Sequence, residues 1–317
     1  SSKEDILKGE MLKYDASLYK TAKAVFAALT LIPGERLILI CSPRPLAKNA
    51  PQELIERFKE RKIAAKYFTQ EYISARLWRQ EYIQKLLNNA IGSVGINHDY
   101  FPSGFFYYLS MYGKQSWLNF NRLWQLSSRM NIASWLILIL TFTFFFRKNI
   151  LNFSVLTSGS SGIALSIIIS FIFQINFGFL YYRLGTIIAS FMLGLTLGSI
   201  CSPRLLKKGI PWARLLSLLE FSLGITALFL CVILRQHQIL YFLITLFIGF
   251  LIGLEFGIFY TKLPAATVYA LDLSGACAGS LLVGLAVIPV LGIFTTCALI
   301  AFTKCLIAVL FLRKPGR

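Results

Sequence analysis

The chain has 317 residues, of which 56% are hydrophobic, and it carries a formal net charge of +18 at pH 7. The apolar residues cluster in runs too long for the core of a soluble domain, so the composition excludes an ordinary soluble protein. The six cysteines show no CxxC spacing and the chain has two histidines, too few ligands at suitable spacing for zinc, so we expect no metal.

Charge divides the chain into two unlike parts. Eleven of the fourteen acidic residues lie in the first part, whereas Glu220, Glu255 and Asp272 lie in the second with thirteen Lys and Arg residues. We therefore predict an extramembrane domain at residues 1–130 and a transmembrane domain at residues 131–317. The cations are expected to face anionic lipid headgroups rather than nucleic acid, because they form no recognised nucleic-acid motif.

The first part predicts short elements of an α/β domain. Residues 13–29 place apolar side chains at helical spacing, and Arg36–Cys41 is an apolar run suited to a buried strand. A helix is expected from Pro51, and another at residues 70–88 with Thr69 as its N-cap. A helix followed by a central strand predicts the end of an α/β sheet.

A polar island, Asn97, His98 and Asp99, separates this part from an aromatic stretch at residues 105–112. We interpret the island as a capping loop that leads into an interfacial helix, because Tyr and Trp prefer the headgroup level. A binding role is the alternative interpretation, so the three side chains are kept as candidate site residues.

Apolar runs of the second part are long enough to predict transmembrane helices. A bilayer core of about 30 Å needs roughly 20 residues of helix, and helix is the state that pairs every backbone group in hydrocarbon. We predict about seven such helices, of which the first and third are short. They are residues 132–146, 161–182, 185–201, 214–234, 239–261, 268–290 and 293–312.

The loop cations predict an orientation. If all seven runs cross, Arg183 and Arg235 lie on one side and the other loop cations lie opposite. The positive-inside rule then places the C-terminus in the cytoplasm and residues 1–130 outside, and one crossing fewer reverses this result. The opposite side carries Arg147, Lys148, Arg204, Lys207, Lys208, Arg214, Lys262, Arg313, Lys314 and Arg317.

Ionisable side chains within the apolar runs are candidate site residues, because a charge at membrane depth is costly unless it is paired or functional. These residues are Arg183, Glu220, Glu255, Asp272 and Lys304. We expect Lys304 to pair with Asp272 or Glu255. The pair would be either an interhelical pin or part of a pathway for protons or a polar substrate.

Two small-xxx-small patterns predict close helix packing, Gly194 with Gly198 and Gly275 with Gly279. Such glycines serve contacts within one chain or between two chains, so a helix-mediated oligomer is among the expectations.

Several ordered patterns run through the whole chain. In the first part they are Ser17-Leu-Tyr-Lys-Thr-Ala-Lys-Ala-Val-Phe26, Ile32-Pro-Gly-Glu-Arg36, Leu54-Ile-Glu-Arg-Phe-Lys-Glu-Arg61, Tyr67-Phe-Thr-Gln-Glu-Tyr-Ile73 and Ile96-Asn-His-Asp99 with Pro102. In the second part they are Gln174, Gly178, Tyr181, Gly185, Phe191-Met-Leu-Gly-Leu-Thr-Leu-Gly198, Tyr269-Ala-Leu-Asp-Leu-Ser-Gly-Ala276, Ile288-Pro289 and Gly292.

In these patterns the chain resembles the C-terminal part of membrane-embedded spermidine synthase-like proteins, in which an aminopropyltransferase-type domain is fused to hydrophobic helices. The resemblance implies a mainly α fold, a transmembrane bundle preceded by a truncated α/β segment of a spermidine synthase domain. It also implies polyamine biosynthesis at a bacterial inner membrane, with the lipid bilayer and a polyamine as partners. The chain departs from the family pattern at Ser166, where a glutamate is expected.

The resemblance further implies that the catalytic half lies upstream of Ser1. No GxGxxG turn follows a strand in residues 1–130, and such a cradle is needed to hold a nucleoside. We therefore expect no catalytic residue and no cofactor in this chain, which alone would be inactive. Decarboxylated S-adenosylmethionine would be the co-substrate only where the upstream half is present.

Two other functions remain as hypotheses. A polytopic transporter or scaffold for a small polar or cationic solute is favoured by Glu255, Asp272 and Lys304 within the apolar runs. A lipid-modifying enzyme built on His98 and Asp99 has less support, because no nucleophile motif accompanies these residues.

Overall fold

The fold is described from a computed structural model of the chain. The structure describes residues 9–34, 36–45, 51–62, 69–113, 130–178, 181–207, 209–233 and 237–313. Two compact units make up the chain, residues 1–98 with 102–123 and residues 99–101 with 124–317, and each is described by itself. Residues 114–129, which adjoin the predicted domain boundary, lie outside the described ranges.

The first unit combines short helices with a two-stranded sheet. Its elements are α1 (Glu10–Val25), β1 (Ala28–Ile32), β2 (Ile38–Ser42), α2 (Pro51–Glu60), α3 (Gln70–Trp78), α4 (Gln80–Ala90), the 3-10 turn η1 (Ile91–Ser93) and α5 (Ser103–Gly113). The strands are antiparallel, with Leu31 opposite Leu39 and Thr30 opposite Ile40.

One face of this hairpin is packed and the other is open. Leu31 is buried in a small core with Ala16 of α1 and Leu87 of α4. On β2 the side chains alternate, so Leu39 packs against this core, whereas Ile38 and Ile40 are 53% and 42% exposed. Apolar side chains are therefore partly exposed on the second face of a sheet that has two strands in the described part of the chain, and Ile38 there lines a cavity with Leu54 of α2 and Leu77 of α3.

The expected helix at residues 13–29 is too long at its C-terminal end. The helix ends at Val25, and Phe26 adopts an extended conformation before β1 begins at Ala28. Leu29 has helical spacing in the sequence, but in the structure it pairs across the sheet with Cys41. Pairing with β2, the next strand along the chain, thus decides the conformation of this segment, which helical spacing alone does not record.

The helix expected at residues 70–88 is interrupted. Thr69 caps it as predicted, because its hydroxyl accepts a hydrogen bond from the Tyr72 N–H at 3.3 Å. The helix breaks at Arg79 into α3 and α4.

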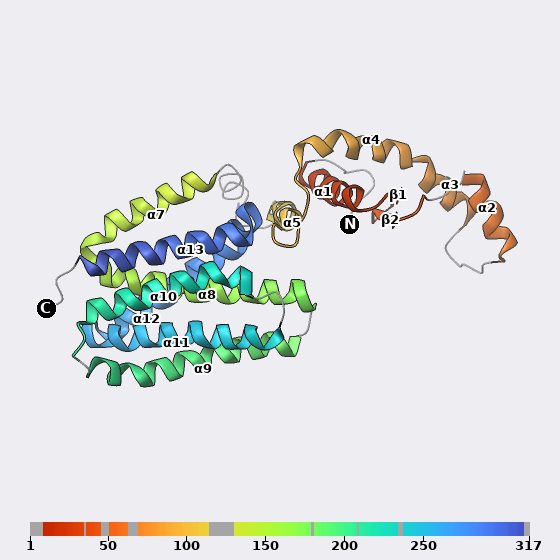
Figure 1. The fold of residues 1–317 in the computed structure, drawn as a ribbon. Helices are drawn as coiled ribbons and strands as arrows, with labels where there is room; N and C mark the ends of the chain where they lie inside the picture. The colour runs from red at the N-terminus through yellow and green to blue at the C-terminus, as the bar shows by residue number, and fades with distance from the viewer. Residues whose placement is uncertain are drawn as a thin grey trace. The chain divides into compact units, whose positions relative to one another are not determined.

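The second unit is a helical bundle, shown in Figure 1. Its elements are α7 (Ile132–Phe146), the 3-10 turn η2 (Arg147–Asn149), α8 (Ile150–Phe177), α9 (Tyr181–Leu206), α10 (Trp212–Ile233), α11 (Gln238–Lys262), α12 (Ala265–Leu282), the π-helical turn η3 (Val283–Val287) and α13 (Ile288–Leu312).

Five stretches of the described chain are helical, long and apolar enough to cross a membrane, as a multi-pass membrane protein requires. They are residues 132–177, 181–206, 212–230, 238–262 and 265–312. The first and last are 46 and 48 residues long, and each contains a break, at η2 and at η3. Because roughly 20 residues cross a bilayer, both stretches have the length for two crossings.

Helix α8 begins at Ile150, eleven residues before the apolar run predicted at residue 161. The added turns are rich in Ser, Thr and Gly, which lowers their hydropathy. Their side chains are nevertheless buried against other helices, Ser154 and Ser158 completely. Hydropathy alone therefore missed a part of α8 that is as deeply buried as the apolar part.

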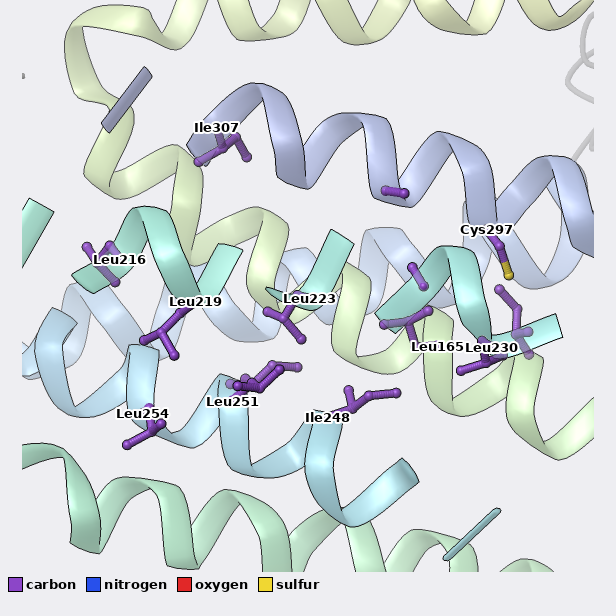
Figure 2. Packing of buried hydrophobic residues seen from close by; sticks show 14 of the residues in the cluster. Leu165, Leu216, Leu219, Leu223, Leu230, Ile248, Leu251, Leu254, Cys297 and Ile307 are labelled. Atoms are coloured by element: carbon purple, nitrogen blue, oxygen red, sulfur yellow. The ribbon is translucent and has the colours of Figure 1, made fainter. Parts of the chain in front are cut away.

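Leucine and isoleucine side chains fill the centre of the bundle, as Figure 2 shows. Those of α10, such as Leu219 and Leu223, lie beside Leu251 of α11 and are fully or almost fully buried. At 25 cal/mol per Å² such burial would stabilise a soluble core, but in lipid close packing itself has to hold the helices together.

Candidate functional site: a buried ionic cluster

The most unusual feature of the bundle is a charged cluster in its interior. The Lys304 ammonium of α13 lies 2.8 Å from Oε2 of Glu220 on α10. The two side chains are 1% and 0% exposed. A buried ion pair persists only where its geometry repays the loss of hydration, so the contact has to be close and well bonded.

Two serines of α8 complete the contacts of this pair. The Ser154 hydroxyl donates to Oε1 of Glu220 at 2.5 Å. Lys304 also donates to the Ser158 hydroxyl at 2.9 Å. Oε1 of Glu220 therefore accepts a hydrogen bond from a neutral hydroxyl, and Oε2 lies in ion-pair contact with the ammonium.

A second acid joins the cluster through Ser158. The Ser158 hydroxyl, which accepts from Lys304, donates to Oε2 of Glu255 on α11 at 2.5 Å. Glu255 is 0% exposed, and its Oε1 has no hydrogen-bond partner within the described residues. The cluster thus holds two carboxyl groups and one ammonium group, linked through Ser158.

The cluster lies at one level of the bundle. Glu220 is eight residues after the start of α10, Glu255 is seven residues before the end of α11, and Lys304 is eight residues before the end of α13. At 1.5 Å per residue these positions are roughly 10–12 Å from the helix ends. This depth removes all three side chains from bulk water.

A glycine brings α10 close to α13 beside the ion pair. A methyl group added to Gly224 would lie 3.0 Å from the sulfur of Cys305, 3.2 Å from the carbonyl oxygen of Ala301 and 3.5 Å from Cβ of Lys304. The absence of a side chain at Gly224 therefore sets the helix separation at which the buried pair forms.

The expected partner of Lys304 was wrong. The structure pairs Lys304 with Glu220 rather than with Asp272 or Glu255, because α13 packs mainly against α10. Glu255 reaches the cluster through a hydroxyl. Asp272, on α12, is partly exposed and faces Gly159 of α8, and no described residue forms an ion pair with it.

Arg183 lies away from the cluster, near the start of α9. Its guanidinium donates to the side-chain oxygen of Gln238 at the start of α11 and to the Tyr182 hydroxyl. Nearby, the Asn176 amide donates to the Tyr241 hydroxyl at 2.7 Å. These contacts tie helix ends together, as polar side chains at an interface do.

The polar loop supports the capping interpretation at Asn97. Its side-chain oxygen accepts from the Gly104 N–H at 2.9 Å, in the first turn of α5, and Ser103 donates to the carbonyl of Ile96. His98 and Asp99 are exposed, and their side chains form no hydrogen bond or ion pair with a described residue. The loop therefore contains a helix cap but no paired acid and base.

The next residue, Tyr100, is attached to the bundle. Helix α13 is broken at Gly292, whose φ of 81° is favourable for glycine. The Ile293 N–H that this break frees donates to the Tyr100 carbonyl oxygen at 2.9 Å, so it stays paired. The tyrosine ring packs on Phe294, with 5.2 Å between ring centroids.

The small-xxx-small glycines form contacts between helices of this chain. A methyl group on Gly194 or Gly198 of α9 would overlap the backbone of α11, and the same holds for Gly249 and Gly253 of α11 against α9. Gly275 and Gly279 of α12 approach the backbone of α8 in the same way. The surfaces of these glycines are therefore already in contact with other helices of the same chain.

The sequence did not single out Ser154 and Ser158, which connect the cluster. A signal was present, because Ser154 and Ser158 stand four residues apart and so share one helix face. Among the described residues, no group of three or more His, Cys, Asp and Glu side chains is placed to hold a metal ion.

Comparison of the chain with known protein families, with curated proteins and with solved structures finds no match. Conclusions about function therefore depend on the residues and their geometry.

Proposed function

We propose that this chain is the membrane-embedded C-terminal part of a spermidine synthase-like protein, and that polypeptide before Ser1 supplies the nucleoside-binding half. The observation that carries the proposal is the open hairpin of the first unit. An antiparallel sheet that faces water on one side normally presents polar side chains there, whereas here Ile38 and Ile40 are apolar and exposed. Further strands and helices would cover these side chains and complete this domain.

The chemistry explains why such a half is required. Aminopropyl transfer moves a three-carbon group from the sulfonium of decarboxylated S-adenosylmethionine to an amine nitrogen and releases methylthioadenosine. The reaction needs a base within reach of the amine and a cradle for the nucleoside. The polar loop at residues 97–99, which the resemblance assigns to this chain, contributes a helix cap and no catalytic group. The chain would therefore supply the membrane anchor and the C-terminal end of the enzyme domain.

Charge distribution supports a defined orientation in a bacterial inner membrane. The described cations at the ends of α9, α11 and α13 and at the starts of α8 and α10 belong to one end of the bundle, which Figure 1 shows on the left. These are Arg147, Lys148, Arg204, Lys207, Arg214, Lys262 and Arg313. With seven crossings this end, and the C-terminus, would face the cytoplasm. Lys208, Arg235, Lys314 and Arg317 lie outside the described residues.

The test begins with the natively expressed polypeptide. Its intact mass is measured after capture with an antibody against α4, and methylthioadenosine release is then followed with putrescine as acceptor. A mass well above the 35.7 kDa of this chain, with release that the 317-residue chain alone lacks, supports the proposal. A mass of 35.7 kDa, or a larger protein that releases none, contradicts it.

A second candidate function is transport of a small cationic solute, for which the excess carboxylate of the cluster is the specific observation. Two acids against one ammonium leave a cation-attracting site, although all three side chains are sealed from water in this conformation. Radiolabelled putrescine is offered to proteoliposomes that contain the chain, its Glu255→Gln variant or its Asp272→Asn variant. Uptake that Glu255→Gln abolishes favours transport, and uptake equal to that of empty liposomes contradicts it.

A further inference from the structure

We propose that the buried cluster is a proton-binding site and that Glu255 holds a dissociable proton at neutral pH. The inference concerns the charge state of the cluster and rests on neither function proposed above; with the proton in place, the cluster lacks the excess negative charge that the transport hypothesis uses. It begins from the number of charges. Glu220, Glu255 and Lys304 are all sealed in the bundle, and with every group ionised the cluster would carry one uncompensated negative charge.

An uncompensated charge in an apolar interior is so costly that the group neutralises instead. The described groups around Glu255 offer no second cation. Helix α8 presents hydroxyls to it and contains no titratable residue between Ile150 and Phe177, and α13 presents Lys304, which is paired.

The remaining neighbours of α11 add no positive charge at this level. Helix α10 presents Glu220, and its Arg214 is exposed near the start of the helix. Asp272 lies about two turns after the start of α12, and the arginines of α9 lie near its two ends, at Arg183 and Arg204. Lys262 is two turns away on α11 itself. One proton on a carboxyl group is therefore the simplest way to make the cluster neutral.

The contacts decide which carboxyl holds the proton. Glu220 has the ammonium 2.8 Å from Oε2 and the Ser154 hydroxyl 2.5 Å from Oε1, so a positive charge lies against this carboxylate and compensates its ionised form. Glu255 has one hydroxyl donor and no ion pair among the described residues, and its Oε1 is unpartnered. The two hydroxyl distances are equal, so it is the ammonium that distinguishes the acids.

Ser158 connects this proton to the ion pair. Its hydroxyl accepts from Lys304 and donates to Glu255, so the charge state of one side affects the other through one shared oxygen. Loss of the proton from Glu255 would place a second negative charge beside Ser158 and draw the ammonium toward it.

The experiment is infrared spectroscopy of the full chain in nanodiscs, where a protonated carboxyl shows a C=O stretching band separate from the carboxylate bands. We expect a band at pH 7 that shifts when glutamate is labelled with ¹³C at its side-chain carboxyl. Glu255→Gln should remove it, whereas Asp272→Asn, an acid-to-amide control outside the cluster, should leave it. Glu220→Gln should also remove it, because Glu255 then becomes the counter-ion of Lys304.

The labelled wild-type spectrum keeps the test valid where a variant fails to fold. A wild-type spectrum with no glutamate C=O band at pH 7 overturns the proposal. A band that persists in folded Glu255→Gln protein also overturns it. So does a melting temperature that rises with sodium or potassium in the wild type but not in Glu255→Gln, since a metal cation would then replace the proton.

Discussion

Asp15 and Glu220 show two environments for a buried acid. Glu220 faces an ammonium and a hydroxyl, whereas Oδ2 of Asp15, on α1 of the first unit, has no hydrogen-bond partner among the described residues. Burial raises the pKa of Asp15 to about 6. Glu71 behaves oppositely: it lies in the first turn of α3, where hydrogen bonds from its own backbone and from Thr69 lower its pKa.

The raised pKa of Asp15 predicts a pH-dependent stability. The folded state holds this proton up to about pH 6, while the unfolded chain releases it near pH 3.8, so folding stability falls as pH rises between these values. The loss is at most about 3 kcal/mol, from roughly two pKa units at 1.36 kcal/mol each. Asp15→Asn should remove this dependence and stabilise α1 at pH 7.

The measurement is amide hydrogen exchange of α1 in the full chain, corrected for the pH dependence of chemical exchange. Glu71→Gln serves as the control, because the lowered pKa of Glu71 predicts the opposite pH dependence. The contribution of Glu71 to folding stability is present above its unfolded pKa and is lost as pH falls. Equal protection of α1 in wild type and Asp15→Asn at pH 7 would show that Asp15 is not the cause.

The Glu220–Lys304 pair predicts a non-additive pair of substitutions. Lys304→Leu leaves a buried carboxyl without its cation and should cost about 3–5 kcal/mol, while adding Glu220→Leu should restore much of the loss. The readout is thermal unfolding in nanodiscs. Lys304→Leu with Asp272→Leu is the matched control and should remain as unstable as the single variant. If Asp272→Leu restored the stability instead, Asp272 rather than Glu220 would be the partner of Lys304.

Sequence reasoning at the residue scale found the buried charges but not their partners. Glu220, Glu255 and Lys304 stand out because charge is rare in apolar runs. The acid that pairs with Lys304 depends on which helices are neighbours and on how each helix is rotated about its axis. A hydropathy profile determines neither. The bridging hydroxyl of Ser158 lies in a stretch polar enough to have been excluded from the predicted helix.

At the scale of elements, helices α9 and α11 are joined by a reciprocal glycine contact. Gly194 and Gly198 face the backbone of α11, and Gly249 and Gly253 face the backbone of α9. Backbones this close gain dispersion and weak Cα–H···O contacts that side chains would prevent.

This contact predicts that one methyl group at Gly198 is destabilising and that the same change at Gly185 is not. Gly198→Ala has to push the α11 backbone away, which should cost roughly 1–3 kcal/mol. Gly185, also on α9, has nothing within 4 Å of an added methyl group, so Gly185→Ala is the matched control. Thermal unfolding of both variants in nanodiscs checks this. Equal melting temperatures would mean that the two helices are not in backbone contact.

Element boundaries were predictable where one local signal dominates. Thr69 is the N-cap of α3, and Pro51 is the first residue of α2, as expected from the sequence. The apolar runs locate α9, α10 and α11 to within a few residues. Prediction failed at β1, whose partner strand overrides its helical spacing, and at the first turns of α8, whose burial comes from neighbours rather than composition.

On the scale of the whole molecule, charge separates the two ends of the bundle. Seven described loop or terminal cations belong to the end where α9, α11 and α13 finish, and Arg183 belongs to the other. Through the positive-inside rule, this polarity predicts that a green fluorescent protein fused after Arg317 fluoresces in bacterial cells and that an alkaline phosphatase fusion at the same place is inactive. The reverse pattern would require a different orientation.

The helices of the bundle are associated most extensively as three pairs, α9 with α11, α10 with α13 and α8 with α12. A glycine brings the two backbones close together in each pair. The cluster lies where the three helix pairs meet, with Glu255 from the first, Glu220 and Lys304 from the second, and Ser158 from the third. If the helix pairs moved relative to one another, the ion pair would stay intact because both of its residues belong to the same pair. The hydrogen bonds of Ser158 would break first, so relative movement of the helix pairs would disconnect Glu255 from the ion pair.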